Sequence, residues 1–131
     1  MSQATVTDLG ENEEEGIRLA RRRKLDGDVR LADPEGFGEV LLPCKDVSVT
    51  GLFVYSSACV RPGSEFICHV PLADGTIVEA TGRVSRVVLD QERPAKSGMG
   101  IRFTRLARDA RERLLSFTMP PSPANVLASL A

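Results

Sequence analysis

The sequence predicts an all-β domain that ends in one C-terminal helix. Apolar and polar residues alternate in several short segments between about residues 28 and 103, which is the pattern of half-buried strands. Turn-forming residues such as Gly, Pro and Asp separate these segments. From Leu106 onward the apolar spacing changes to that of a helix. Together these patterns favour a small β-barrel over an α/β sheet.

Six strands are expected, and each is bounded by a turn sequence. Their expected ranges are 28–31, 39–44, 52–55, 66–72, 76–89 and 98–103. Val40, Leu42 and Cys44 share one parity, and Pro43 is expected at an edge or a bulge because it cannot donate a ladder hydrogen bond. Gly82 lies within the longest strand and suggests the bend or bulge that a closing barrel requires.

The last element is expected to be an amphipathic helix of about three turns, long enough to plug or cover the end of a small barrel. Leu106, Ala110, Leu114 and Phe117 recur at helical spacing, and charged residues fill the positions between them.

Two tails flank a single predicted domain of residues 16–118. Residues 1–15 are acidic and have few large apolar side chains, so they cannot bury enough surface to offset their ordering entropy. We expect them to form a disordered acidic tail. Residues 119–131 begin with Met-Pro-Pro-Ser-Pro, in which the prolines stop the preceding helix. This segment is expected to be a Pro-rich flexible tail.

The sequence shows no sign of export or membrane insertion. Its first fifteen residues are polar and acidic, and no apolar run approaches the ~18 residues that span a bilayer. Cys44, Cys59 and Cys68 are odd in number, have apolar neighbours and lack the spacing of a zinc or thioredoxin motif. We therefore expect a cytoplasmic protein with buried free thiols.

No group of residues suggests catalysis. His69 is the single histidine and lies inside an apolar strand, where a structural role is expected. The sequence contains no Walker-type loop, dinucleotide fingerprint or zincin motif. The chain is expected not to be an enzyme and to need no metal or cofactor.

A basic segment follows the acidic run, although the formal net charge of the chain is only −1. It contains Arg18 and the run Arg21–Lys24. On its own, such a cluster can be a solvated segment or a nucleic-acid contact. Aromatic residues make up only 5% of the chain and Trp is absent, which disfavours a barrel that stacks nucleic-acid bases. The uneven charge distribution therefore favours a local anion site.

A second polar pattern lies between two predicted strands. Residues 46–51 read Asp-Val-Ser-Val-Thr-Gly, or Asp-x-Ser-x-x-Gly. Alone this pattern is weak, because Asp and Ser are common in turns, where both bond local backbone amides. It gains weight because Arg18-x-x-x-Arg22 precedes it by about two dozen residues.

In these motifs the sequence resembles the PilZ family. The match continues with Leu-Phe-Val at 52–54, Pro-Gly at 62–63, Gly-Arg-Val at 82–84, and Gly-Met-Gly-Ile-Arg-Phe at 98–103 before the terminal helix. It covers about residues 16–118. The resemblance implies a six-stranded antiparallel barrel, a flexible N-terminal arm, a C-terminal α-helix, and binding of the bacterial second messenger cyclic di-GMP.

The resemblance also implies roles for individual residues. Arg18 and Arg22 are assigned to the phosphates and guanines of the ligand, because a guanidinium fork fits both kinds of acceptor. Asp46 is expected to accept from guanine N–H groups or to position an arginine, and Ser48 can both donate and accept. Gly51 is expected to allow close approach of the ligand, or a positive φ.

Three further arginines are secondary candidates for ligand contact. Arg21 and Arg23 are either phosphate contacts or solvated residues. Arg86 follows the strand glycine by four residues, a position that carries an aromatic or long basic side chain in relatives. Strict alternation would place Arg86 on the inward Val84 face unless a bulge intervenes. Ile17 stands where an arginine could engage a second ligand, which favours one cyclic di-GMP per protomer.

The implied function is that of a stand-alone receptor in a monomer or a weak dimer. Cyclic di-GMP would order the arginine arm, and the altered surface would act on an unidentified effector protein in motility, biofilm formation or a related output. An adaptor with the same barrel, acting through protein contacts in pilus, flagellar or chemosensory machinery without nucleotide, is the main alternative. No nucleic-acid polymer is expected as a partner.

Overall fold

The computed structural model describes residues 21–57 and 60–119. These residues form seven strands, one short 3-10 helix and one α-helix. The strands are β1 (Arg23–Lys24), β2 (Asp28–Ala32), β3 (Glu39–Val47), β4 (Gly51–Tyr55), β5 (Glu65–Pro71), β6 (Ile77–Val88) and β7 (Gly98–Leu106). The helices are η1 (Pro94–Lys96) and α3 (Arg108–Thr118). The predicted tails, 1–15 and most of 119–131, lie outside the described residues.

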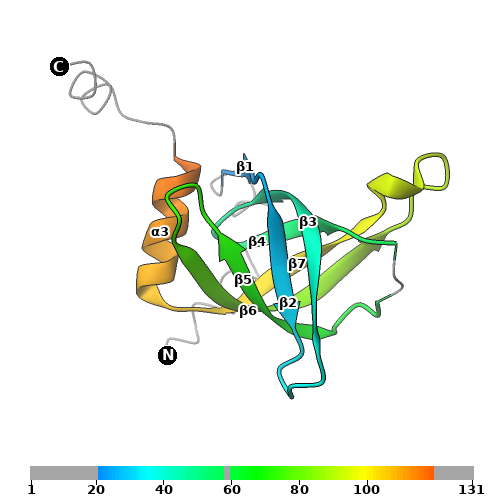
Figure 1. Ribbon diagram of the computed structural model, residues 1–131, viewed down its shortest axis with the longest axis horizontal. Coiled ribbons are helices and arrows are strands. Elements are labelled where there is room, and N and C mark those ends of the chain that lie inside the picture. Colours follow the sequence, from blue (N-terminus) through cyan, green and yellow to red (C-terminus); the bar gives the residue numbers. More distant parts are fainter. Residues whose placement is uncertain (1–20, 58–59, 120–131) are drawn as a thin grey trace.

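Six of the strands close into an antiparallel barrel (Figure 1). The strands follow the order β3-β2-β5-β6-β7-β4, and β4 also pairs with β3 and so closes the ring. Closure leaves no open sheet edge in the ring, which is how small all-β domains avoid edge-to-edge association. The predicted six-stranded barrel with a C-terminal helix is confirmed.

The short strand β1 extends β2 along the same side of β3. Arg23 pairs with Val47 and Lys24 with Asp46, and Asp28 then pairs with Pro43 further along β3. Leu25, between β1 and β2, is 6% exposed and joins the core. The described part of the predicted flexible arm is therefore fixed to the barrel, and the part that carries Arg18 lies outside the described residues.

Bulges shape the barrel where the sequence suggested them. The pairing of β6 with β7 shifts between Thr81 and Gly82, and again between Val84 and Arg86. A Cβ on Gly82 would lie 2.5 Å from the Ile101 side chain, so this bend needs a glycine. At Pro43, β3 is paired with β2 only, and its pairing with β4 begins at the next residue. Pro43 therefore sits at a local edge of the ladder.

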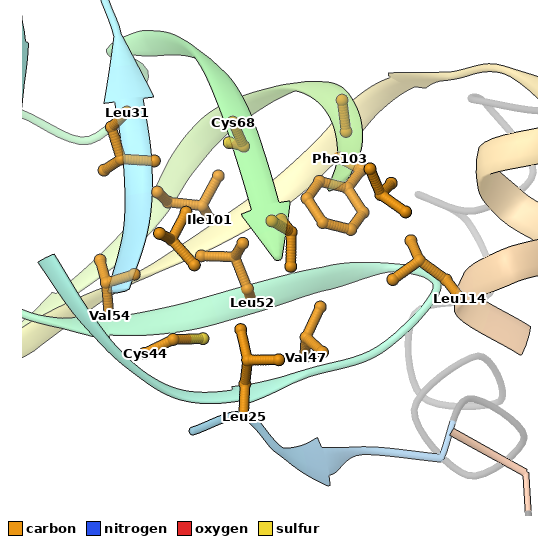
Figure 2. Packing of buried hydrophobic residues seen from close by; sticks show 14 of the residues in the cluster. Leu25, Leu31, Cys44, Val47, Leu52, Val54, Cys68, Ile101, Phe103 and Leu114 are labelled. Carbon is orange, nitrogen blue, oxygen red and sulfur yellow. The ribbon is translucent and has the colours of Figure 1, made fainter. Parts of the chain in front are cut away.

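The barrel interior is filled by apolar side chains from every strand of the ring (Figure 2). Leu31, Leu52, Val54 and Cys68 are among the fully buried ones. Leu114 of α3 is 0% exposed and covers one end of this core. This packing confirms the helix as a lid, which begins at Arg108, so Leu106 belongs to β7 rather than to the helix as its spacing suggested.

The first hairpin departs from the predicted alternation. Cys44 is buried, but Val40 and Leu41 are 46% and 61% exposed, although they lie on opposite faces of β3. The β2–β3 hairpin projects beyond the ring (Figure 1), so both of its faces meet solvent at this end. Phe37 at its tip is 84% exposed.

Candidate functional site

The two polar motifs meet at Arg22. This residue directly precedes β1, whereas Asp46 lies near the end of β3 and Ser48 begins the turn to β4. Arg22 Nε donates to Asp46 Oδ1 at 2.9 Å, and its NH2 group lies 2.8 Å from the same oxygen. Arg22 NH1 donates to Ser48 Oγ at 3.4 Å. The β1–β3 pairing brings residues 24 positions apart into one guanidinium–carboxylate–hydroxyl cluster.

The β3–β4 turn fixes Ser48 in place. The Ser48 amide donates to the carbonyl of Gly51 at 2.8 Å, and its hydroxyl accepts from the Thr50 amide at 3.1 Å. The hydroxyls of Ser48 and Thr50 are 2.8 Å apart. Ser48 is 0% exposed, so these bonds satisfy a buried polar group and hold its oxygen at the edge of the cluster.

Gly51 serves the barrel in a way that the sequence did not reveal. Its φ is not positive, unlike those of Gly27, Gly36 and other described turn glycines. A Cβ at Gly51 would lie 2.1 Å from the carbonyl oxygen of Ile101 in β7. The absence of a side chain therefore lets β4 approach β7, and Gly51 does not adopt the positive φ that glycine allows.

Arg86 reaches the outer face because a bulge intervenes. The register shift between Val84 and Arg86 reverses the alternation, and the Arg86 side chain is exposed. Its guanidinium lies 5.6 Å from the centre of the Phe53 ring. Asp46, Phe53, Gly100 and Arg86 are successive partners across β3, β4, β7 and β6. Arg86 therefore shares an outer-face row with Asp46.

Phe53 is a residue that the sequence analysis overlooked. It is 7% exposed yet belongs to the outer face, between the inward Leu52 and Val54. The ammonium of Lys45 lies 5.7 Å from its ring centre, so Phe53 has a cation–π contact with Lys45 as well as with Arg86. The sequence contains a signal for this residue. Alternation from Leu52 and Val54 points Phe53 outward, and an outward aromatic ring can be covered by a cationic side chain.

The structure places the remaining arginine candidates differently relative to the Arg22–Asp46–Ser48 cluster. Arg21 is exposed at the start of the described chain, close in sequence to the cluster. Arg23 extends to the far end of α3, where NH1 donates to the Phe117 carbonyl at 2.8 Å. The structure therefore brings Arg22, Asp46 and Ser48 together and turns Arg23 away from them. Arg18 and Ile17 lie outside the described residues.

The charges of Asp46 and Arg22 affect the pKa of a neighbouring thiol, that of Cys44 in β3. The pKa of Cys44 is raised to about 12, chiefly by burial and also by the nearby Asp46 carboxylate, while Arg22 acts in the opposite direction. Burial also raises the pKa of Cys68 to about 12, with a smaller contribution from Cys44. Both residues are free cysteines with protonated, unreactive thiols at neutral pH.

The arrangement suits recognition of an anion with hydrogen-bonding bases. Arginine offers a planar fork that matches phosphate oxygens or a guanine edge, and the neighbouring carboxylate and hydroxyl complete a mixed donor and acceptor set. Among residues 21–57 and 60–119, no group of His, Cys, Asp and Glu could hold a metal ion. His69 pairs with Glu79 across β5 and β6 at 3.1 Å, as a structural histidine would.

A closed six-stranded barrel with a C-terminal helix and an arginine segment paired to β3 defines the class of domain. The family model described as PilZ domain matches residues 17–119. The chain belongs to the PilZ domain family. No curated protein matched its sequence.

Solved structures of PilZ proteins share this fold. The Bacillus subtilis inhibitor of motility MotI/DgrA has a TM-score of 0.64 and 17% identity, over 85% of this chain and 50% of that protein. The PilZ domain of Escherichia coli YcgR with c-di-GMP has a TM-score of 0.56 and 11% identity, over 76% of this chain and 86% of that one. The PilZ domain of CeSA from a cellulose-synthesizing bacterium has a TM-score of 0.54 and 16% identity, over 74% and 93%. The chain thus spans half the length of MotI/DgrA.

None of the described helices is long and apolar enough to cross a membrane.

Proposed function

We propose that the chain is a cyclic di-GMP receptor whose ligand binds at the Arg22–Asp46–Ser48 cluster. One observation carries the proposal: residues from two separate motifs converge on one guanidinium, with Nε–Oδ1 and NH2–Oδ1 distances of 2.9 and 2.8 Å. The family membership and the YcgR domain bound to c-di-GMP support the choice of ligand.

The chemistry of the ligand matches that of the cluster. Cyclic di-GMP carries two phosphodiester charges and two guanines, and arginine can fork onto phosphate oxygens or onto guanine O6 and N7. Arg22 supplies one fork, and Arg18 is proposed to supply a second. Asp46 either accepts from guanine N–H groups or continues to orient Arg22. Arg86 borders the same outer face and is a further proposed contact.

The proposed signal is the ordering of the arm that carries Arg18. Residues 22–24 are held on β3 by strand pairing and by the Arg22–Asp46 bond, so the proposed ordering concerns the segment before them. Closure of that segment over the ligand would form a new surface for an effector protein. Because Ile17 cannot engage a second ligand as an arginine would, we propose one cyclic di-GMP per protomer.

Titration calorimetry tests this function. The wild-type chain is expected to bind cyclic di-GMP, and Arg22→Ala and Ser48→Ala are expected to bind at least tenfold more weakly. Loss of a charge-assisted hydrogen bond costs about 1.5–3 kcal/mol, which corresponds to that change in affinity. Arg30→Ala is the matched control, since Arg30 pairs with Glu39 on the projecting hairpin, away from the cluster.

Absence of heat from the wild type at high micromolar ligand would refute the proposal, and so would equal binding by Arg22→Ala. Two ligands per protomer would refute the argument from Ile17.

A nucleotide-independent adaptor is the second candidate. It is favoured by the β2–β3 hairpin, where Phe37, Val40 and Leu41 expose apolar surface beyond the barrel. Such exposed apolar side chains are typical of protein contacts. A wild type that binds no cyclic di-GMP would support this candidate.

A further inference from the structure

Arg23 connects the arm to the C-terminal end of α3. Its NH1 group donates to the Phe117 carbonyl oxygen at 2.8 Å, and its guanidinium carbon lies 4.4 Å from the centre of the Phe117 ring. The two residues are 94 positions apart in the chain. Arg23, the neighbour of Arg22, thus makes a hydrogen bond to the backbone of Phe117 and a cation–π contact with its ring.

The end of α3 requires such a partner. The last four carbonyls of a helix have no acceptor role within the helix, and the helix dipole favours a cation there. The Thr118 hydroxyl donates to the Leu114 carbonyl, and the Met119 amide donates to the Leu115 carbonyl. The last turn of α3 contains no basic residue of its own. Arg23 therefore supplies from the arm both a donor and a positive charge.

The position of β1 relates this contact to the proposed ligand site. Consecutive strand residues point to opposite sides, so Arg22 turns toward Asp46 and Ser48 while Arg23 turns toward Phe117. β1 has only two residues, and its ladder with β3 is correspondingly short. A two-residue strand is held weakly by its ladder alone. The Arg23–Phe117 contact adds a second attachment next to Arg22.

We propose that Phe117 is a positioning residue for the ligand site, acting through Arg23, and that ligand binding in turn stabilises the last turn of α3. The Arg23–Phe117 pair is the arm–helix latch. With the latch formed, Arg22 is held beside Asp46 and Ser48 before the ligand arrives, so less ordering opposes binding. The coupling is reciprocal, because any effect of the latch on ligand affinity requires an equal effect of ligand on the latch.

The latch also connects the proposed ligand site to a groove beside α3. Phe117 lines the groove between α3 and the β5–β6 turn together with Leu72 and Ser116. A ligand that fixes the latch therefore fixes one wall of this groove. This inference rests on the proposed ligand, although the latch itself can be tested without it.

The test compares Phe117→Leu with Phe117→Tyr in the full chain. Leucine retains apolar packing and removes the aromatic face, whereas tyrosine keeps the ring. Phe117→Leu is expected to bind cyclic di-GMP about three- to tenfold more weakly, in line with the loss of one cation–π contact. Phe117→Tyr is expected to restore wild-type affinity.

Amide exchange provides the readout that a merely structural role would not change. Cyclic di-GMP is expected to slow exchange at Leu115–Met119 in the wild type but not in Phe117→Leu. Without ligand, Phe117→Leu is expected to speed exchange of the Arg23 amide, which by strand alternation faces Val47 of β3. In a double-mutant cycle, Arg23→Met is expected to weaken binding less in Phe117→Leu than in the wild type, because the cation–π contact is already lost.

Unchanged affinity in Phe117→Leu, together with unchanged exchange at Arg23, would overturn the latch. A loss of affinity that tyrosine does not restore would also overturn it, because general packing would then be the cause. If the wild type binds no cyclic di-GMP, the proposed function fails, and the exchange of the Arg23 amide in ligand-free Phe117→Leu still decides whether the latch exists.

Discussion

Substitution of Gly51 by alanine tests whether this motif glycine serves the barrel itself. The added Cβ would lie 2.1 Å from the Ile101 carbonyl oxygen and 3.1 Å from Arg102 Cα, and both of these atoms are backbone. A normal contact of about 3.4 Å requires β4 and β7 to separate by roughly 1 Å, which weakens a five-residue ladder. Overpacking of this kind costs about 1–3 kcal/mol, and the rigid neighbour places Gly51→Ala near the upper end.

Thermal unfolding of the ligand-free chain measures this effect. A loss of about 3 kcal/mol corresponds to a decrease in Tm of roughly 12 °C for a domain of this size. The control is Gly100→Ala on β7, where the new Cβ would meet side chains alone, Arg86 at 3.1 Å and Ser85 Oγ at 3.5 Å, and should lower Tm far less. Equal Tm values for Gly51→Ala and the wild type, or equal losses in the two variants, would refute the reasoning.

Three further predictions concern the core and the surface. Leu114→Ala is expected to lower the free energy of unfolding by about 2–5 kcal/mol in a urea titration, because Leu114 is 0% exposed beneath α3. Phe37→Ser is expected to change it by less than about 0.5 kcal/mol, because the ring is 84% exposed. Burial raises the pKa values of Cys44 and Cys68 from 9.0 to about 12, so the folded state retains protons that the unfolded state loses. The stability due to these thiols is therefore complete below pH 9 and decreases as the pH rises toward 12. Urea midpoints measured from pH 8 to 11 should decline less steeply in a Cys44→Ala/Cys68→Ala variant, and parallel slopes would contradict this account.

The positions of the strands along the chain could be predicted because alternation and turn residues are local signals. The ranges expected for β4 and β5 agree with the structure to within one residue, and Gly82 marked a bulge correctly. The exposed Val40 and Leu41 could not be predicted from alternation. Alternation specifies which residues share a face, but only the tertiary fold determines how far a hairpin extends beyond the barrel.

The sequence predicted the three residues that form the candidate cluster, but it did not predict how the surrounding side chains are arranged. The motif spacing identified Arg22, Asp46 and Ser48, and the structure brings them within hydrogen-bonding distance. The bulge before Arg86 depends on pairing between β6 and β7, so its outward direction was not fixed by the sequence. The contact of Arg23 with Phe117 joins residues far apart in the chain, for which a local pattern carries no signal.

The role of Gly51 shows how one residue can satisfy two explanations. A glycine after Asp-x-Ser is compatible with ligand approach, and the structure adds that β7 leaves no room for a Cβ. A motif position can therefore be required for folding even where its neighbours bind a ligand. Variants of Gly51 report on the barrel, and variants of Arg22 and Ser48 are the informative ones for binding.

The most direct test of the central proposal is a residue-by-residue NMR map of the chain titrated with cyclic di-GMP. We predict that amide shifts concentrate at Arg22–Lys24, at residues 46–51 and near Arg86, with smaller changes in the last turn of α3. The β2–β3 hairpin around Phe37 should remain unchanged. Shifts confined to the hairpin, or no shifts at millimolar ligand, would contradict a receptor site built on Arg22, Asp46 and Ser48.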